Sequence, residues 1–110
     1  MLDKQDLFNI QLATKIVKLP QGEIIIKEFT TAGREQFEMM ALKMQDGKAK
    51  NMKAKLIAMS CVKEDGNRMF GDDELAKISE LPSKITELIF NAVLDLNGMG
   101  ADALGESEGN

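Results

Sequence analysis

The sequence predicts an α+β domain in which a small N-terminal β-hairpin packs on a bundle of about three to four helices. Two runs of alternating apolar residues, separated by Pro20, Gln21 and Gly22, indicate the hairpin. Apolar residues at helical spacing over 37–44 and 85–96 indicate helices. The length of 110 residues is that of a single domain.

The hairpin strands are predicted near 14–19 and 23–29, on either side of the turn. Val17 and Ile25 give these runs a partly two-sided apolar character. An isolated hairpin is only marginally stable in water, so its apolar face is expected to pack on a helix. The preceding residues, 1–12, show no clear period and are interpreted as a loose arm or a short helical turn.

A helix is predicted after the hairpin. Either Thr30 or Thr31 can cap its start, and Asp46 with Gly47 marks its end. The apolar stripe of this helix consists of Phe37, Met40, Ala41 and Met44. Such a stripe, at steps of three and four residues, places its members on one side of the helix.

The middle of the chain is ambiguous. Residues 56–62 fit either a helix or a strand, because short apolar runs do not distinguish the two by period alone. The polar segment 64–67 is a strong turn signal. A second short hairpin near 61–70 is therefore allowed, with 68–70 as its return strand.

Two further helices are predicted. The first is capped by Asp72 and stops before Pro82. The second covers 82–97, with Pro82 at its first position and Asn97 and Gly98 at its end. Its apolar stripe is unusually wide and comprises Ile85, Leu88, Ile89, Phe90, Ala92, Val93, Leu94 and Leu96. We expect one globular domain over 1–98 and a flexible acidic tail over 99–110.

Composition argues against catalysis. The chain has no His and a single Cys, which removes His-based nucleophile activation, His metal ligands and multi-Cys metal sites. Cys61 lies in an apolar run and is predicted to be buried rather than reactive. The acidic run 72–74 is interpreted as a helix start, because it lacks the spacing of a calcium loop. We expect no enzymatic activity, no metal and no cofactor.

Charge and hydropathy limit the partners. With 14 Lys plus Arg against 18 Asp plus Glu, the net charge of −4 argues against nucleic acid as a partner. The apolar runs are far shorter than the ~20 residues that a membrane span needs. Charged residues at positions 3, 4 and 6 leave no room for the apolar part of a signal peptide. We expect a soluble protein of a reducing compartment.

Methionine is abundant, with eight residues in the chain. This flexible side chain fills gaps in cores, and it is also over-used on surfaces that accept helical partners of varying shape. We favour the core interpretation for most of the eight. Met39 and Met99 are the two that a core is expected to need least.

Residues 54–100 carry an ordered series of motifs: an apolar segment, a polar turn, a Met-Phe pair, an acidic helix start, a Leu-Pro pair and a helix ending in Leu-Asn-Gly. These motifs are Leu56–Val62, Lys63–Gly66, Met69 with Phe70, Asp72–Glu74, Leu81 with Pro82, and Leu96–Gly98. The passage KEFTTAGREQFE at 27–38 fits the same pattern. In order and spacing the chain resembles the tail assembly chaperones of long-tailed, siphovirus-type bacteriophages.

The resemblance implies a non-enzymatic protein that binds the long, largely helical tape measure protein and keeps it soluble. It also implies help in recruiting tail tube subunits, action in the host cytoplasm and absence from the mature virion, and it is compatible with a homo-oligomer. A groove framed by the helices at 37–44 and 82–97 is our candidate surface. Its predicted partner-binding residues are Phe37, Met40, Met44, Leu88, Ile89, Phe90 and Leu94.

Other function classes stay open at this point. One is a small phage tail structural or adaptor protein, such as a completion factor. Another is a small regulator that binds a host protein. A carboxylate-dependent enzyme is the least favoured, because nothing in the sequence places two carboxylates across a pocket.

Overall fold

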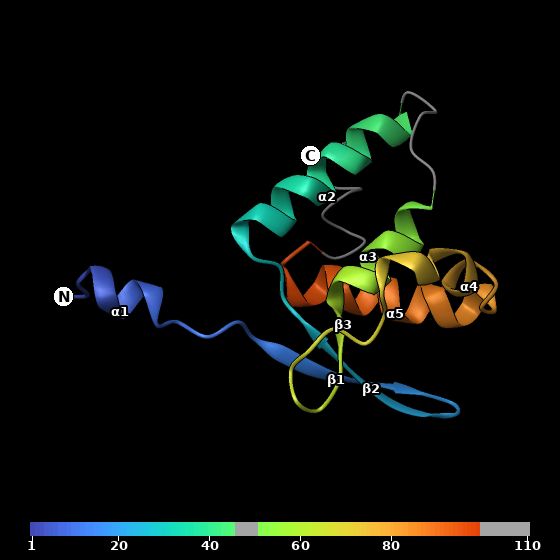
Figure 1. The fold of residues 1–110 in the computed structure, drawn as a ribbon, viewed down its shortest axis with the longest axis horizontal. Coiled ribbons are helices and arrows are strands. Elements are labelled where there is room, and N and C mark those ends of the chain that lie inside the picture. The colour runs from blue at the N-terminus through green and yellow to red at the C-terminus, as the bar shows by residue number, and fades with distance from the viewer. Residues whose placement is uncertain (46–50, 100–110) are drawn as a thin grey trace.

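The computed structural model describes residues 1–45 and 51–99, and Figure 1 shows the course of the chain. The architecture is α+β, as the sequence predicts. The elements are α1 (Lys4–Phe8), β1 (Thr14–Leu19), β2 (Gly22–Lys27), α2 (Thr31–Gln45), α3 (Met52–Ser60), β3 (Cys61–Val62), the 3-10 turn η1 (Asp72–Glu74), α4 (Leu75–Ser79) and α5 (Ser83–Leu96).

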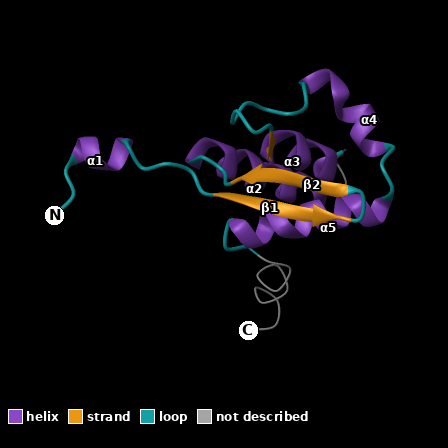
Figure 2. Cartoon of the chain, turned by 90° about the horizontal axis from the view of Figure 1, so that it is seen from below, coloured by secondary structure: helices purple, strands orange, loops and turns teal. Residues whose placement is uncertain are grey.

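The three strands form one antiparallel sheet in the order β1-β2-β3. Paired residues share a face, so Ile16, Ile25 and Val62 form a row across one face of the sheet. Val17 and Ile24 are paired on the other face, where Val17 is buried. The helix α5 packs against β1 and β2 and supplies the apolar cover that the hairpin needs (Figure 2).

The predicted hairpin is confirmed, but β2 ends before Phe29. Glu28 still extends the pairing, because its N–H donates to the carbonyl of Ala13 at 2.9 Å. The N–H of Phe29 instead donates to the side-chain oxygen of Asn97 at 2.9 Å, so the chain leaves the sheet toward α5. A distant side chain, rather than a local signal, sets this strand end.

The ambiguous segment 56–62 contains both a helix and a strand. The helix α3 ends at Ser60, and Cys61 and Val62 then pair with β2. The return of the second hairpin is reduced to a single bridge between Val62 and Arg68. The helix α3 and the strand β3 thus follow one another without a linker, which explains why a single period does not fit the segment.

The turn after β3 is stabilised by hydrogen bonds among its own residues, 63–67. The carboxylate of Asp65 accepts the N–H of Asn67 at 2.9 Å, and this hydrogen bond lowers the pKa of Asp65 below its ordinary value. Gly66 adopts φ 89° and donates its N–H to the carbonyl of Lys63 at 2.9 Å. The predicted turn is therefore confirmed, and the Asp65 carboxylate and the positive φ of Gly66 stabilise it.

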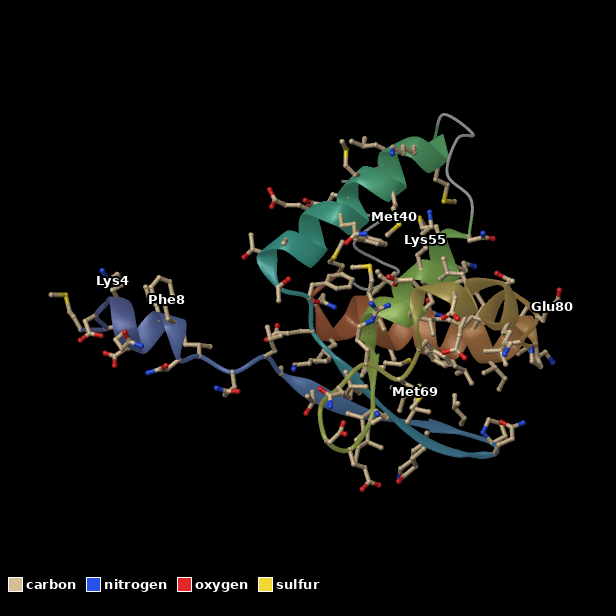
Figure 3. The ribbon with its side chains drawn as sticks, in the orientation of Figure 1. Lys4, Phe8, Met40, Lys55, Met69 and Glu80 are labelled. Atoms are coloured by element: carbon tan, nitrogen blue, oxygen red, sulfur yellow. The ribbon has the colours of Figure 1, made fainter. Side chains whose placement is uncertain are left out.

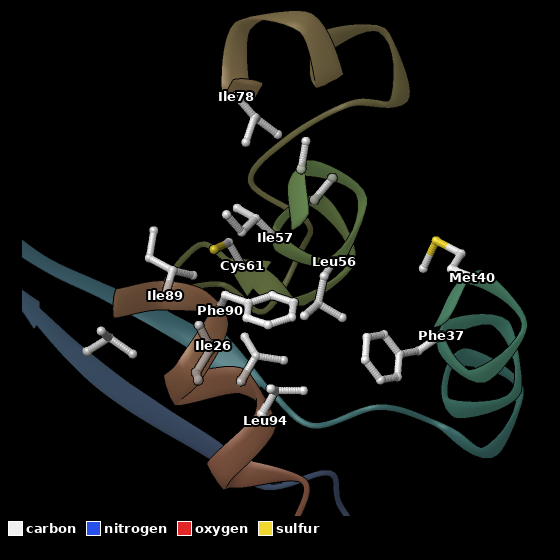
Figure 4. Packing of buried hydrophobic residues seen from close by; sticks show 14 of the residues in the cluster. Ile26, Phe37, Met40, Leu56, Ile57, Cys61, Ile78, Ile89, Phe90 and Leu94 are labelled. Carbon is white, nitrogen blue, oxygen red and sulfur yellow. The ribbon is translucent and has the colours of Figure 1, made fainter. Parts of the chain in front are cut away.

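One apolar core lies between the sheet, α3 and α5 (Figure 4). The helix α3 is central, because it packs against α2, α4 and α5. The buried residues of the core are Val17, Ile26, Phe37, Met40, Ala54, Leu56, Ile57, Ala58, Cys61, Ile78, Ile89, Phe90, Val93, Leu94 and Met99. Every element from β1 to α5 except the 3-10 turn contributes at least one of them.

The helix α2 is attached at its N-terminal half. Thr30, one of the two predicted caps, accepts the N–H three residues further on at 3.0 Å. The ring of Phe37 stacks on Phe29, with centroids 5.8 Å apart, and is buried. The predicted helix end at Asp46 and Gly47 lies outside the described residues.

Two predicted helix starts are shifted by one residue. The sequence predicts Asp72 as a cap, but Gly71 precedes the turn and donates its N–H to the carboxylate of Glu74 at 2.9 Å. Pro82, predicted as the first helical residue, immediately precedes α5 and accepts the N–H of Ile85 at 2.9 Å. In both cases the residue before the helical turn, Gly71 or Pro82, still has an extended ψ angle, so the turn begins one residue later. Residue types alone do not specify this position.

The end of α5 is a Schellman motif, as Asn97 and Gly98 predict. Gly98 has φ 70° and donates its N–H to the carbonyl of Asp95 at 3.0 Å, while Met99 donates to the carbonyl of Leu94 at 2.7 Å. The chain reversal at Gly98 turns Met99 back over the helix, where it is only 9% exposed. The expectation that a core hardly needs Met99 is therefore wrong.

The structure describes the N-terminal end of the chain from residue 1, but its description of the C-terminal end stops at Met99. Residues 1–12 leave the body as an arm that carries α1 (Figures 1 and 2). Of the acidic tail predicted over 99–110, only Met99 is described by the structure. Residues 100–110 lie outside the described part of the chain. Among the helices described, none combines the length and the apolar character needed to cross a bilayer.

Candidate functional site

The seven predicted partner-binding residues do not form one surface. Five of them belong to the core and are at most 8% exposed: Phe37, Met40, Ile89, Phe90 and Leu94. Met44, at 56% exposed, and Leu88, at 46% exposed, lie on the surface. The wide stripe of α5 is therefore explained by packing on two sides, against the sheet and against α3.

The helix α3 occupies the space that the predicted groove would need. Both α2 and α5 pack against α3, which lies between them (Figures 1 and 4). In Figure 4 the ring of Phe37 points from α2 toward Leu56 of α3, and Phe90 points toward the same side chain from α5. These aromatic residues thus hold the helices together.

A hollow of about 420 Å³ remains where α2, α3, α4 and α5 meet. Met44 reaches it from the last turn of α2, and Met52 and Ala54 from the first turn of α3. Ile78 of α4 and Thr86 of α5 also line it. We call this the junction hollow; its remaining lining residues are Asn51, Lys53 and Ser79.

A second, shallow hollow of about 390 Å³ follows on α5 and is lined by Leu88 and its neighbours Ser83, Lys84, Glu87 and Asn91. An ion pair between Lys53 and Glu87 joins the two hollows, because Lys53 lines the first and Glu87 the second. The ammonium of Lys53 also lies 5.4 Å from the ring centroid of Phe90. We call the two hollows, with the ion pair between them, the Met44–Leu88 track.

The outward face of the sheet is a separate apolar surface that sequence reasoning missed. A hollow of about 380 Å³ there is lined by the exposed Ile16, by Ile25 and the buried Val62 of the same row, by Ile24, and by Met69 from the following loop. Met69 is labelled in Figure 3. The polar rim of this hollow consists of Glu23, Lys63 and Glu64. The partly two-sided character of the two strands was the signal for this surface. We call it the outer sheet face.

The N-terminal arm, residues 1–12, carries a third set of uncovered apolar side chains. Leu2, Leu7, Phe8 and Ile10 are all more than half exposed. No residue of α1 is buried, and the arm stands clear of the body in Figures 1 and 3. Runs of exposed apolar side chains in a folded protein indicate contact with another molecule.

The described residues offer little for chemistry. Among residues 1–45 and 51–99, no group of three or more His, Cys, Asp or Glu is placed to hold a metal ion. Burial raises the pKa of the Cys61 thiol to about 12, so the thiolate is scarce at neutral pH. The surface features that remain are apolar and suited to binding.

The fold is similar to a known one. It matches the structure of the bacteriophage HK97 tail assembly chaperone with a TM-score of 0.59 over 84% of this chain and 90% of that chain, at 15% sequence identity. No family model matches the chain, and no curated protein matches it. The likeness is therefore one of fold.

Proposed function

We propose, from this likeness of fold, that the chain is a tail assembly chaperone of a long-tailed bacteriophage. The carrying observation is that the likeness spans most of both chains, so it concerns the whole architecture and not one motif. The order of motifs over 54–100, which resembles the same class, supports it from the sequence. The proposed role is non-enzymatic: the protein binds the tape measure protein and keeps it soluble.

The proposed binding site for the tape measure protein is the Met44–Leu88 track. A helical partner presents an apolar ridge, and the track offers apolar side chains at both ends with an ion pair between them. Met44 and Met52 can adjust their side-chain rotamers to partner residues of different shape. This suits a partner that presents many similar helical segments and requires modest sequence specificity.

Co-expression with the cognate tape measure protein tests the function. We expect the soluble fraction of that protein, measured after centrifugation, to rise when this chain is present. The chain should also co-purify with it. A tape measure protein that precipitates equally with and without the chain would contradict the chaperone proposal.

Two aspartate variants test the track with a matched control. Met44→Asp and Leu88→Asp place a charge on exposed positions, so both should fold normally. Each should weaken tape measure binding at least about tenfold through lost apolar contact. Met39→Asp is the control, because Met39 has the same side chain on the same helix at similar exposure but does not line the track. Equal losses in all three variants would place the site elsewhere.

The remaining parts of the proposal concern the compartment in which the protein acts, its contact with tail tube subunits and its absence from the finished particle. The protein is proposed to act in the host cytoplasm, to contact tail tube subunits and to be left out of the mature virion. Mass spectrometry of purified virions tests this directly. Detection at an amount comparable to known tail proteins would favour a structural or adaptor protein instead.

A further inference from the structure

The charged side chains that line the Met44–Leu88 track are mostly cationic. Lys53 lines the junction hollow and Lys84 lines the hollow around Leu88, where Glu87 is the only carboxylate among the lining residues. Glu87 is already paired with Lys53. Lys84 has no ion-pair partner within residues 1–45 and 51–99. The track therefore keeps an excess of positive charge on a chain whose net charge is −4.

The sequence at the start of α3 has the same bias. Residues 48–55 include four Lys and no Asp or Glu. In the described part of this segment, Asn51, Met52, Lys53 and Ala54 line the junction hollow. Lys84 adds its charge in the first turn of α5, where the helix dipole disfavours a cation and no acidic side chain offsets it. Carboxylates of a partner therefore meet favourable charge along this surface.

The cations stand beside apolar side chains. Lys84 and Leu88 are four residues apart on α5, so they lie on the same side of the helix, and both are exposed. The ammonium of Lys53 lies 5.4 Å from the ring centroid of Phe90, and the Lys53 side chain is 46% exposed. An exposed ion pair contributes little to stability, so Lys53 can exchange Glu87 for a carboxylate of a partner at small cost.

The partner that fits this surface has an apolar ridge with carboxylates beside it. An amphipathic helix presents both at steps of three and four residues. A nucleic acid fits less well, because its phosphates would meet Glu87 and Leu88 as well as the lysines.

We propose that the Met44–Leu88 track selects acidic amphipathic helices. A carboxylate of the partner pairs with Lys84 while its apolar residues pack on Leu88 and Met44. This inference rests on the proposed function for the identity of the partner, and it states which segments of the tape measure protein are bound. Those segments are amphipathic helices with Asp or Glu beside the apolar ridge.

Charge variants of the full chain test the selection. The probes are overlapping synthetic peptides that cover the helical segments of the cognate tape measure protein, with binding measured by fluorescence anisotropy. Lys84→Gln should weaken the binding of acidic peptides about threefold and Lys84→Glu about tenfold. Glu87→Gln should strengthen it about twofold, because Lys53 then pairs with the peptide alone. Lys15→Glu is the matched control, because Lys15 is exposed on β1 and lines neither hollow of the track.

Neutral versions of the same peptides, with Gln for Glu and Asn for Asp, separate charge from apolar contact. They should bind about threefold more weakly, and added salt should reduce this difference. Equal binding of acidic and neutral versions overturns the inference but leaves the chaperone function intact, because co-expression tests that function separately. Three other results also overturn the inference: binding of no peptide, equal losses in Lys15→Glu and Lys84→Glu, or equally tight binding of a single-stranded DNA oligonucleotide.

Discussion

Asn97, which ends α5, ties the junction between β2 and α2 to the core, and its replacement gives a sharp test of the fold. Its side-chain oxygen accepts the N–H of Phe29 at 2.9 Å, across 68 residues of sequence. Its side-chain nitrogen donates to the carbonyl of Val93 at 2.8 Å, and its own carbonyl lies 3.5 Å from the guanidinium of Arg34. The Asn97→Ala variant removes both side-chain bonds.

The two lost bonds are unequal. Val93 keeps a partner, because the backbone N–H of Asn97 also donates to its carbonyl at 3.2 Å. The N–H of Phe29 is partly buried and loses its acceptor, which costs about 1–3 kcal/mol. We therefore expect the free energy of unfolding to fall by about 2 kcal/mol, or the Tm by roughly 10 °C for a domain of this size.

Urea unfolding followed by circular dichroism measures this change. Asn91→Ala is the matched control: Asn91 is exposed on the same helix, so its loss should be nearly neutral. Asn97→Asp should cost less than Asn97→Ala, because a carboxylate still accepts the N–H of Phe29 and lies near Arg34. Unfolding free energies of Asn97→Ala and Asn91→Ala within about 0.5 kcal/mol would refute the reasoning.

Three further predictions concern stability. Gly98→Ala should cost about 1–2 kcal/mol in thermal unfolding, because φ is 70° while the added Cβ meets open space; an unchanged Tm would contradict this. Phe37→Ala should cost about 3–5 kcal/mol and release α2, seen as faster hydrogen exchange in that helix, since the ring is buried against Phe29; a small, partner-specific effect would instead make Phe37 a binding residue. Burial raises the pKa of Cys61 to about 12 in the folded state, whereas an unfolded thiol ionises near its ordinary pKa of 9.0. Unfolding therefore releases a proton above pH 9, and stability relative to Cys61→Ala should decline from there by up to about 1.4 kcal/mol per pH unit; parallel pH profiles would disprove the burial effect.

The hairpin and the last helix were predictable because their signals are local. Alternation around Pro20 and Gly22 locates β1 and β2, and the Asn97-Gly98 pair locates the end of α5. The end of β2 was not predictable, since it depends on a hydrogen bond from Phe29 to Asn97. A sequence window cannot contain both partners.

The candidate site was predicted less well, because a helical stripe does not say which side meets a partner. Leu88 and Ile89 are neighbours in the same stripe, yet one is exposed and the other is buried. Packing of α5 on two elements makes this difference, and periodicity alone gives no information about the second element. Similarly, Ile25 belonged to a recognised two-sided strand, but the missing cover on its outer side appears only in the assembled sheet.

The sequence by itself determined the α+β class, the hairpin, the capped last helix and a composition that disfavours catalysis, because propensities, turn residues and residue counts are properties of short segments or of the whole list. Only the tertiary structure decided which apolar residues remain at the surface. Burial depends on the distances between elements far apart in the chain, so Met44 and Leu88 stay exposed while Phe37 and Met99 join the core. The arm and the outer sheet face are defined in the same way, by what the rest of the chain leaves uncovered.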